Sequence, residues 1–301
     1  MSGQGERRGV GGLVRTIWRV LLFAGLFVAF VVAGAIPLTV LRLETPAVQI
    51  IYQGLVTLAA ALAAGWLLLR WQDGRRPGAL GFAWTSRTLR ELAGGMVVGA
   101  GALAAVVVPL VLLSMIRFEP DAGGVGELLG TLLVDLLILG VAAAAEEALF
   151  RGYAFQVLVQ GTGPVVATVL SSAAFAVAHG WNPNVGIFAL VNIFLAGVML
   201  AIGYLRTRSL WFVTAVHLGW NWMMASVFDL PVSGLEYFDG PVYTGVPVGP
   251  EWLTGGAFGP EGGLAGTIGF VLALIAVLRV PGFRPAPEMR ELAPLVDTRL
   301  G

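Results

Sequence analysis

The sequence predicts an all-α fold, a polytopic transmembrane helical bundle of about eight spans. The first observation is composition: 57% of the 301 residues are hydrophobic and 12% are charged, about half the charged fraction of a typical soluble domain. The second is that several apolar runs reach the roughly 20 residues that a helix needs to cross a bilayer. The expected spans cover residues 17–41, 47–69, 91–115, 127–150, 164–180, 185–205, 209–228 and 262–279.

The third observation is that arginines fill alternate connecting segments, as the positive-inside rule requires of cytoplasmic loops. The intervening segments are acidic or neutral. An even number of spans and this alternation agree, so we expect a multi-pass protein of the cell membrane with both termini in the cytoplasm. The arginines concerned are Arg7, Arg8, Arg15 and Arg19; Arg70, Arg75, Arg76, Arg87 and Arg90; Arg206 and Arg208; and Arg279, Arg284 and Arg290.

Composition also excludes several functions. The net charge is zero, so no electrostatic footprint for nucleic acid is present. The chain has no cysteine, which excludes disulfides, thiolate nucleophiles and cysteine-ligated metal. All 18 basic residues are arginine, so a lysine nucleophile is excluded as well.

We divide the chain into three parts: N-terminal helices over residues 1–125, a core of four spans over 126–228, and a final part over 229–301. The first apolar run is too long for the core of a signal peptide, and we expect it to remain as a span. The tail after Pro281 is polar and is expected to be loosely ordered. The aromatic residues of the outer loop 229–261 are expected at the membrane interface; they are Tyr237, Phe238, Tyr243, Trp252 and Phe258.

Ionisable residues inside spans are costly and usually functional. The fourth span ends with two adjacent glutamates, Glu146 and Glu147, followed by Arg151. Glu147 and Arg151 are four residues apart and can pair on one helix face. Glu146, about 100° around the helix, then faces elsewhere. An unpaired buried glutamate is suited to act as a general base near neutral pH.

One of the only two histidines, His179, ends the fifth span, with Phe175 one turn before it. A turn is expected at Gly161-Thr162-Gly163. Glu146 lies sixteen residues before Thr162 and His179 seventeen after it, so an antiparallel hairpin brings both to the same depth. A histidine at a helix end is more often structural, but this coincidence favours function.

The other histidine, His217, lies in the seventh span four residues before Asn221, which places both side chains on one helix face. His217 is about 13 Å inward from the start of its span at Arg208, whereas Glu146 and His179 are about 25 Å from their hairpin tip. The two depths agree if that hairpin protrudes into the cytoplasm by about two turns.

The remaining polar residues within spans have simpler interpretations. Asp135 and Asn192 are expected to hydrogen-bond neighbouring helices, as polar side chains in membranes commonly do. Asp135 also lies on the same helix face as Glu146 and could extend the polar lining. The glycines of the third span, Gly94, Gly95, Gly99 and Gly101, suggest close helix packing.

Taken together, the motifs resemble those of the CPBP family of intramembrane endopeptidases, which comprises CAAX proteases and bacteriocin-processing, Abi-like proteins. The family pattern is EExxxR, FxxxH and HxxxN. In this sequence it stands as Glu146-Glu147-xxx-Arg151, Phe175-xxx-His179 and His217-xxx-Asn221, in order and on successive spans. The resemblance covers residues 126–228; the flanking spans are less diagnostic.

The resemblance implies a catalytic set of Glu146, His179, His217 and Asn221. Glu146 and His179 would hold and activate a water, and His217 and Asn221 would stabilise the oxyanion. Glu147, Arg151 and Phe175 would organise the helices or bind the end of the substrate. The expected substrate is a peptide or a prenylated or membrane-anchored protein, cut near the cytoplasmic face: a CAAX-type C-terminus, a leader peptide or an anchored peptide.

The possible cofactor is Zn²⁺, for which Glu146, His179 and His217 are the candidate ligands. Members of the family have been described as metalloproteases on that basis, but a metal-free glutamate mechanism fits equally. Because the usual HExxH helix motif is missing, we favour a mechanism without a tightly held metal.

Two alternatives belong to other functional classes. A proton-coupled transporter would also use buried glutamate and histidine, but it predicts an internal repeat, and the sequence shows none. A non-catalytic scaffold or immunity protein of the same fold could tolerate the loss of Glu146 or His179, whereas this chain has the complete motif set. The sequence does not define the oligomeric state.

Overall fold

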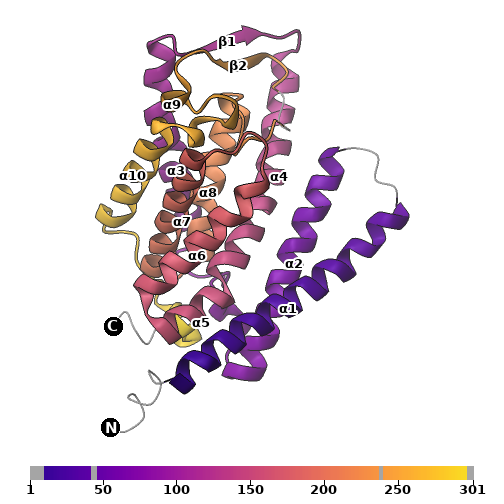
Figure 1. The fold of residues 1–301 in the computed structure, drawn as a ribbon, viewed down its shortest axis with the longest axis vertical. Coiled ribbons are helices and arrows are strands. Elements are labelled where there is room, and N and C mark those ends of the chain that lie inside the picture. Colours follow the sequence, from indigo (N-terminus) through magenta and orange to yellow (C-terminus); the bar gives the residue numbers. More distant parts are fainter. Residues whose placement is uncertain (1–9, 42–45, 237–239, 297–301) are drawn as a thin grey trace.

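The structure is a computed structural model that describes residues 10–41, 46–236 and 240–296. It is a helical bundle with a two-stranded sheet at one end (Figure 1). Four residues with a predicted location lie outside the described ranges: Arg7 and Arg8, expected on the cytoplasmic side, and Tyr237 and Phe238, expected at the membrane interface. The principal elements are α1 (Val10–Leu41), α2 (Pro46–Asp73), α3 (Thr88–Leu112), β1 (Ile116–Pro120), α4 (Val125–Arg151), α5 (Tyr153–Thr162), α6 (Pro164–Ala178), α7 (Ile187–Thr207), α8 (Leu210–Trp222), β2 (Tyr243–Pro247), α9 (Glu251–Thr254), α10 (Leu264–Arg279) and α11 (Glu288–Leu292).

The prediction of an all-α multi-pass membrane bundle is confirmed. Within the described ranges, six helical segments are long and apolar enough to cross a membrane, and α4 and α5 together form one of them. The two remaining predicted spans are the shorter apolar helices α8 and α10. Helix α8 continues as a π-helical turn, η4 (Met223–Val227), so its backbone pattern changes near the predicted Asn221.

The bundle centres on α8, which packs most extensively against α3. Their backbones approach closely because glycines face the contact: a Cβ atom on Gly99 would collide with the carbonyl oxygen of Val216. Gly95 and Gly219 face the same contact. The predicted packing role therefore holds for Gly95 and Gly99. It is wrong for Gly101, which has nothing within 4 Å of an added Cβ.

The start of α8 is fixed by a tight turn. Arg208 has a left-handed backbone with φ of 56°, and it ends α7. The hydroxyl of Ser209 then caps α8 by accepting from the backbone N–H of Phe212 at 3.2 Å, and it donates to the Glu91 carboxylate of α3 at 2.6 Å. This capping satisfies one of the free N–H groups of the helix and ties α8 to α3.

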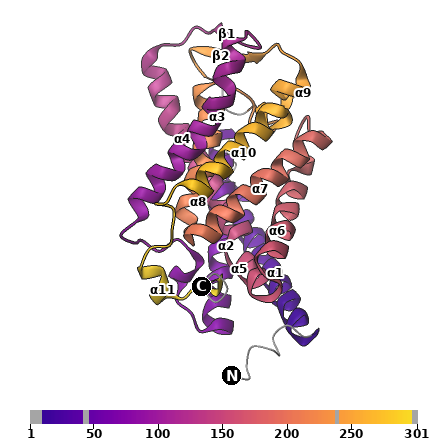
Figure 2. The same cartoon turned by 90° about the vertical axis from the view of Figure 1, so that its left-hand side faces the viewer.

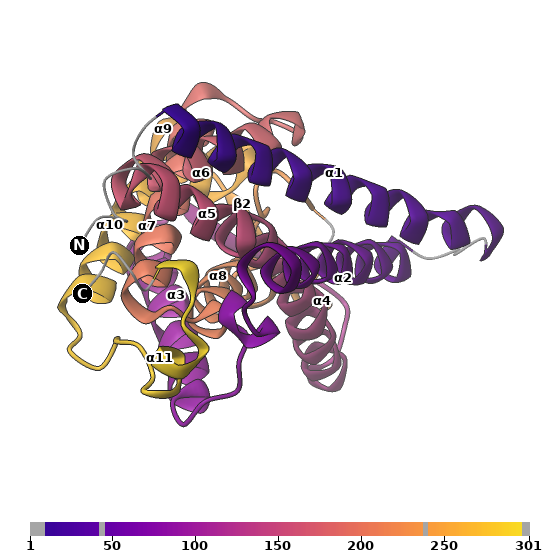
Figure 3. The same cartoon turned by 90° about the horizontal axis from the view of Figure 1, so that it is seen from below.

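Helices α1 and α2 form a hairpin that projects to one side of the bundle (Figures 1 and 3). Its base is joined to α5 by the buried guanidinium of Arg19. Arg19 bonds both carboxylate oxygens of Asp73, at 2.6 and 2.7 Å, and donates to Tyr153 at 3.1 Å and to Gln160 at 2.9 Å. The expected hairpin between α4 and α6 contains an additional short helix. The helix breaks at Gly152, and α5 packs against α1 and α6.

The two ends of the molecule differ. The first turn of α1 and helix α11 lie at one end, and β1 pairs with β2 at the other (Figures 1 and 2). The predicted loose tail is wrong for residues 282–296. Glu288 accepts from the backbone N–H of Ser86 at 2.9 Å, the backbone of Leu295 donates to Gln156 at 2.8 Å, and Met289 is buried.

The outer loop is more structured than the sequence suggested. It contains β2, α9 and two 3-10 turns, η5 (Gly256–Phe258) and η6 (Pro260–Gly262). Of its aromatic residues within the described ranges, Trp252 is exposed, whereas Tyr243 packs edge-on against Phe118 and Phe258 is buried. An interfacial position is therefore wrong for Phe258, because the loop folds back over the bundle.

The glycine seam yields a prediction with an internal control. Gly99→Ala should lower the free energy of unfolding by about 1–3 kcal/mol, because the methyl group overpacks the contact between α3 and α8. Gly101→Ala on the same helix should be neutral or raise it by up to about 1 kcal/mol, because alanine has the higher helix propensity. Denaturation of the purified proteins in detergent, followed by circular dichroism, measures both. Equal effects of the two substitutions would contradict the proposed seam.

Candidate active site

The second glutamate of the α4 motif is completely buried and has two charged or polar partners. Arg151 donates to Glu147 Oε1 at 3.0 Å, as the spacing of four predicted, and neither side chain is exposed to solvent. Glu147 Oε1 also lies 2.9 Å from Nδ1 of His217 in α8. One carboxylate oxygen therefore joins α4 to α8.

The guanidinium of Arg151 has further contacts that fix the neighbouring helices. It donates to the carbonyl oxygen of Gly197 in α7 at 3.3 Å and lies 4.4 Å from the ring centroid of Phe175 in α6. The Phe175 ring in turn packs 4.6 Å from the His179 ring and 6.1 Å from the His217 ring, measured between centroids. Phe175 is thus the apolar platform between the cation and both imidazoles.

His179 lies at the C-terminus of α6, where the helix gives way to the 3-10 turn η3 (His179–Trp181). Its Nδ1 is 2.8 Å from the carbonyl oxygen of Phe175. Because a carbonyl oxygen only accepts, Nδ1 is assigned the proton, and in the neutral ring Nε2 is an acceptor. That Nε2 is 3.9 Å from Glu146 Oε2. The hairpin expectation that Glu146 and His179 lie at one depth is met in the structure.

His217 approaches the same oxygen from α8. Its Nε2 is also 3.9 Å from Glu146 Oε2. This oxygen is buried and, among the described residues, has no hydrogen-bond partner. A separation of 3.9 Å is too long for a hydrogen bond, but two such atoms can share one water lying beside them. Glu146 Oε2 is therefore the point at which the three candidate residues converge.

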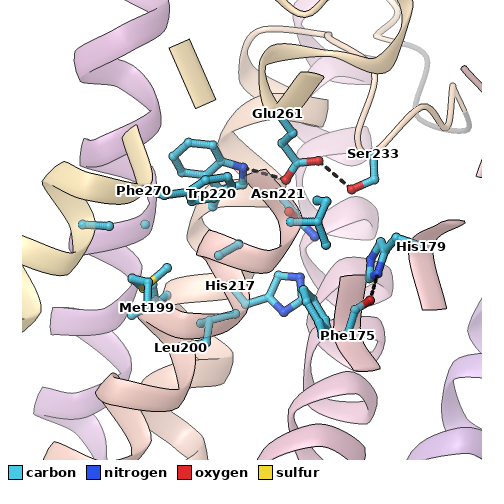
Figure 4. A pocket seen from close by; sticks show the side chains of 15 residues that line it. Phe175, His179, Met199, Leu200, His217, Trp220, Asn221, Ser233, Glu261 and Phe270 are labelled. Carbon is cyan, nitrogen blue, oxygen red and sulfur yellow. Dashed lines mark hydrogen bonds between the residues drawn. The ribbon is translucent and has the colours of Figure 1, made fainter. Parts of the chain in front are cut away.

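Asn221 lines the same pocket as both histidines (Figure 4). Among the described residues it has no side-chain hydrogen bond, so its amide is available to a ligand. The rest of the wall is largely apolar. The lining residues are Gly99, Phe175, His179, Ile193, Ala196, Met199, Leu200, Val216, His217, Trp220, Asn221, Ser233, Glu261, Phe270 and Ala273.

The structure adds one acidic residue that sequence reasoning missed. Glu261 belongs to η6, between the spanning helices, yet its side chain is buried against the pocket (Figure 4). It accepts from Trp220 Nε1 at 3.0 Å and from Ser233 Oγ at 2.5 Å. Burial raises the pKa of Glu261, against the lowering effect of the Ser233 bond. No motif marked it, since it follows several other acidic residues in the outer loop.

Asp135 and Asn192 form hydrogen bonds to neighbouring elements, as the sequence predicted. Asp135 accepts from the hydroxyl of Ser226 at 2.9 Å, which links α4 to the π-helical turn after α8. Asn192 donates to the backbone carbonyls of Glu261 and Gly263, both at 2.8 Å, and accepts from Thr267 at 2.6 Å. Both residues therefore connect elements of the bundle.

Zn²⁺ prefers donor atoms of the kind that Glu146, His179 and His217 present. Over residues 10–41, 46–236 and 240–296, however, no three histidine, aspartate or glutamate side chains are gathered in a metal-binding arrangement. The geometry of the described residues does not fit a metal ion, and the proposed chemistry uses none.

These features define the class of protein: a multi-pass membrane protein with a polar site enclosed by apolar helices. The family model described as "Type II CAAX prenyl endopeptidase Rce1-like" matches residues 128–223, which run from α4 to the end of α8. The match confirms the resemblance to CPBP proteases and supports a hydrolase of the peptidase kind. No curated protein matches the chain.

The buried ion pair gives a stability prediction. Arg151→Ala should lower the free energy of unfolding by about 3–5 kcal/mol, because it leaves the Glu147 carboxylate buried without its main counter-charge. Arg90→Ala, which removes an exposed arginine from α3, should change it by less than about 0.5 kcal/mol. Detergent denaturation again provides the measurement. An Arg151 variant as stable as the Arg90 variant would show that Glu147 does not depend on this pair.

Proposed function

We propose that this protein is an intramembrane endopeptidase in which a water activated by Glu146 and His179 attacks a peptide carbonyl. The observation that supports it best is the convergence on Glu146 Oε2, with the Nε2 atoms of His179 and His217 each 3.9 Å away. A water between these atoms can give its proton to the carboxylate while it attacks. The proton then passes from Glu146 to the leaving amine.

The oxyanion requires hydrogen-bond donors close to the carbonyl oxygen of the substrate. Asn221 supplies an N–H from its amide. His217 donates a hydrogen bond from its Nδ1–H to Glu147, and in the imidazolium form it also donates from Nε2. In that form the charges balance: Arg151 and His217 are positive, and Glu146 and Glu147 are negative. The buried Glu147 thereby supports a cationic His217 without leaving an uncompensated charge in the bilayer.

The substrate class follows from the family match and the wall of the pocket. The match favours a CAAX-type substrate, a peptide with a prenylated C-terminus. The apolar residues Met199, Leu200 and Phe270 make the wall beside the histidines apolar, which is compatible with an apolar segment in the substrate. Arginines cluster at the end where α1 begins, so we propose that both termini are cytoplasmic and that the cut is made near the cytoplasmic face of the membrane.

Substitution of the converging residues tests the proposed roles. Glu146→Ala and His179→Ala should each lower kcat for cleavage of a prenylated CAAX peptide by about 10²–10⁴, the usual contribution of general acid–base catalysis. Asn221→Ala should lower it by about 10²–10³, the usual effect of losing one oxyanion donor. A quenched fluorescent peptide with purified protein gives the rates.

Glu119→Gln provides the control, since Glu119 is an exposed carboxylate of β1, and full activity is expected. Residual activity in Glu146→Ala equal to that of the control would remove Glu146 from the proposed mechanism.

The metal-free mechanism gives a separate prediction. Prolonged dialysis against EDTA should leave cleavage unchanged, because the water is activated by the carboxylate and histidine alone. The matched sample is protein dialysed without EDTA and assayed in parallel. Loss of activity with EDTA that added Zn²⁺ restores would establish a metalloprotease and overturn the metal-free mechanism.

A further inference from the structure

Glu261 is the buried titratable side chain at the pocket that the proposed mechanism does not use. It lies beyond residues 128–223, so the family match assigns it no role. It is 4% exposed and comes from η6, at the end of the outer loop. A carboxylate in such a place is costly unless its hydrogen bonds are made.

Those bonds connect three separate parts of the chain. Oε1 accepts from the indole of Trp220 in α8, and Oε2 accepts from the hydroxyl of Ser233 at the start of the outer loop. The backbone carbonyl of the same residue accepts from Asn192 of α7. Figure 4 shows the carboxylate above Asn221, with the dashed bonds running to Trp220 and Ser233.

The indole is held firmly on its other side as well. Trp220 stacks on Phe270 of α10 with 4.4 Å between ring centroids, and a Cβ on Gly269 would meet the indole at 2.5 Å. The indole of Trp220 is therefore tightly packed between α8, α10 and the outer loop, and its N–H points to Glu261.

The position of Trp220 is important because two candidate catalytic residues are close to it in the sequence. Asn221 follows it directly, and His217 precedes it by three residues on α8. Two residues after Trp220 the α-helix ends and the π-helical turn begins. The helix widens from α to π geometry here, and the indole bond of Trp220 adds a contact from outside the helix that holds its last α-helical turn.

We propose that Glu261 is a positioning residue that ties the outer loop to α8, closes the loop end of the catalytic pocket and orients Asn221. The positioning of Asn221 rests on the function proposed above, whereas the closure of the pocket does not. If the bonds to Trp220 and Ser233 are lost, the loop separates from α8 and the pocket opens toward the loop side.

The chain contains no cysteine, so a single introduced thiol reports access to the pocket. Ile193→Cys places it in the pocket wall, at a buried position that has no proposed role in catalysis. A membrane-impermeant maleimide is applied separately to each side of proteoliposomes containing the full chain. Ala257→Cys, at an exposed position of the outer loop, identifies the loop side and should react equally in every background.

With Glu261 intact, Ile193→Cys should react slowly from the loop side. Glu261→Ala should accelerate that reaction by more than about tenfold, because it removes two hydrogen bonds to a charged group and the loss of one alone is worth about tenfold. Glu261→Gln should restore protection, because the amide can still accept from Trp220 and donate to Ser233. Ser233→Ala removes only one bond, should give an intermediate rate, and serves if Glu261→Ala does not fold.

Kinetics test the positioning of Asn221. Glu261→Ala should lower kcat with KM changed less than about twofold, because a misoriented oxyanion donor is felt in the transition state. Glu251→Gln, at an exposed glutamate of the same loop, should leave both unchanged. If no variant, nor the parent, cleaves peptides while the labelling pattern holds, the proposed function fails and the closure stands. Unchanged labelling in both Glu261→Ala and Ser233→Ala, with Ala257→Cys reacting normally, overturns the proposal.

Discussion

The arrangement of the site depends on one buried charge, the carboxylate of Glu147. It has no solvent exposure, and an uncompensated ion in such a place would be strongly destabilising. Its compensation comes from Arg151 on the same helix and from His217 across the bundle. Since Arg151 also bonds Gly197 and lies over Phe175, balancing this single charge holds α4, α6, α7 and α8 in one mutual arrangement. Arg151 and the Nδ1 atom of His217 are both bonded to Glu147. Glu146, one residue earlier, therefore faces the Nε2 atoms of both histidines.

The two ends of the pocket are built differently. At the α4 side, charged and aromatic side chains of the motif set fix the histidines. At the other side, the outer loop folds back, so that Glu261 meets Trp220 just before α8 turns into a π-helix. The glycine seam between α3 and α8 allows the close approach of the backbones that gives α8 its central position. Packing thus sets where α8 lies, and the bond from Trp220 to Glu261 joins its C-terminal end to the outer loop.

Much of this was predictable because the bilayer imposes simple rules. Hydropathy located the spans, the spacing of four paired Glu147 with Arg151, and the hairpin count brought Glu146 to His179. Other features depend on contacts distant in sequence. The local sequence pattern does not predict the helix break at Gly152, the burial of Phe258 or the docking of residues 282–296 against the bundle. Glu261 resembled the exposed acids of its loop, and its burial arises from Trp220, Ser233 and Asn192 on other elements. The bond from His217 to Glu147 likewise needed the relative rotation of α4 and α8, which periodicity does not supply.

The central claim is that Glu146 acts as a base toward a water held beside His179 and His217. A single turnover in water enriched in oxygen-18, with enzyme in excess over a CAAX peptide, tests it directly. Attack by water places one oxygen-18 in the newly formed carboxylate of the product during that first turnover, and the protein gains none. If Glu146 were instead a nucleophile, it would form a mixed anhydride with the substrate, and attack of water on the Glu146 carbonyl would leave the unlabelled glutamate oxygen in the product and the label in the Glu146 side chain. Mass spectrometry of the product and of the peptide containing Glu146 distinguishes the two, and label on Glu146 would contradict the mechanism.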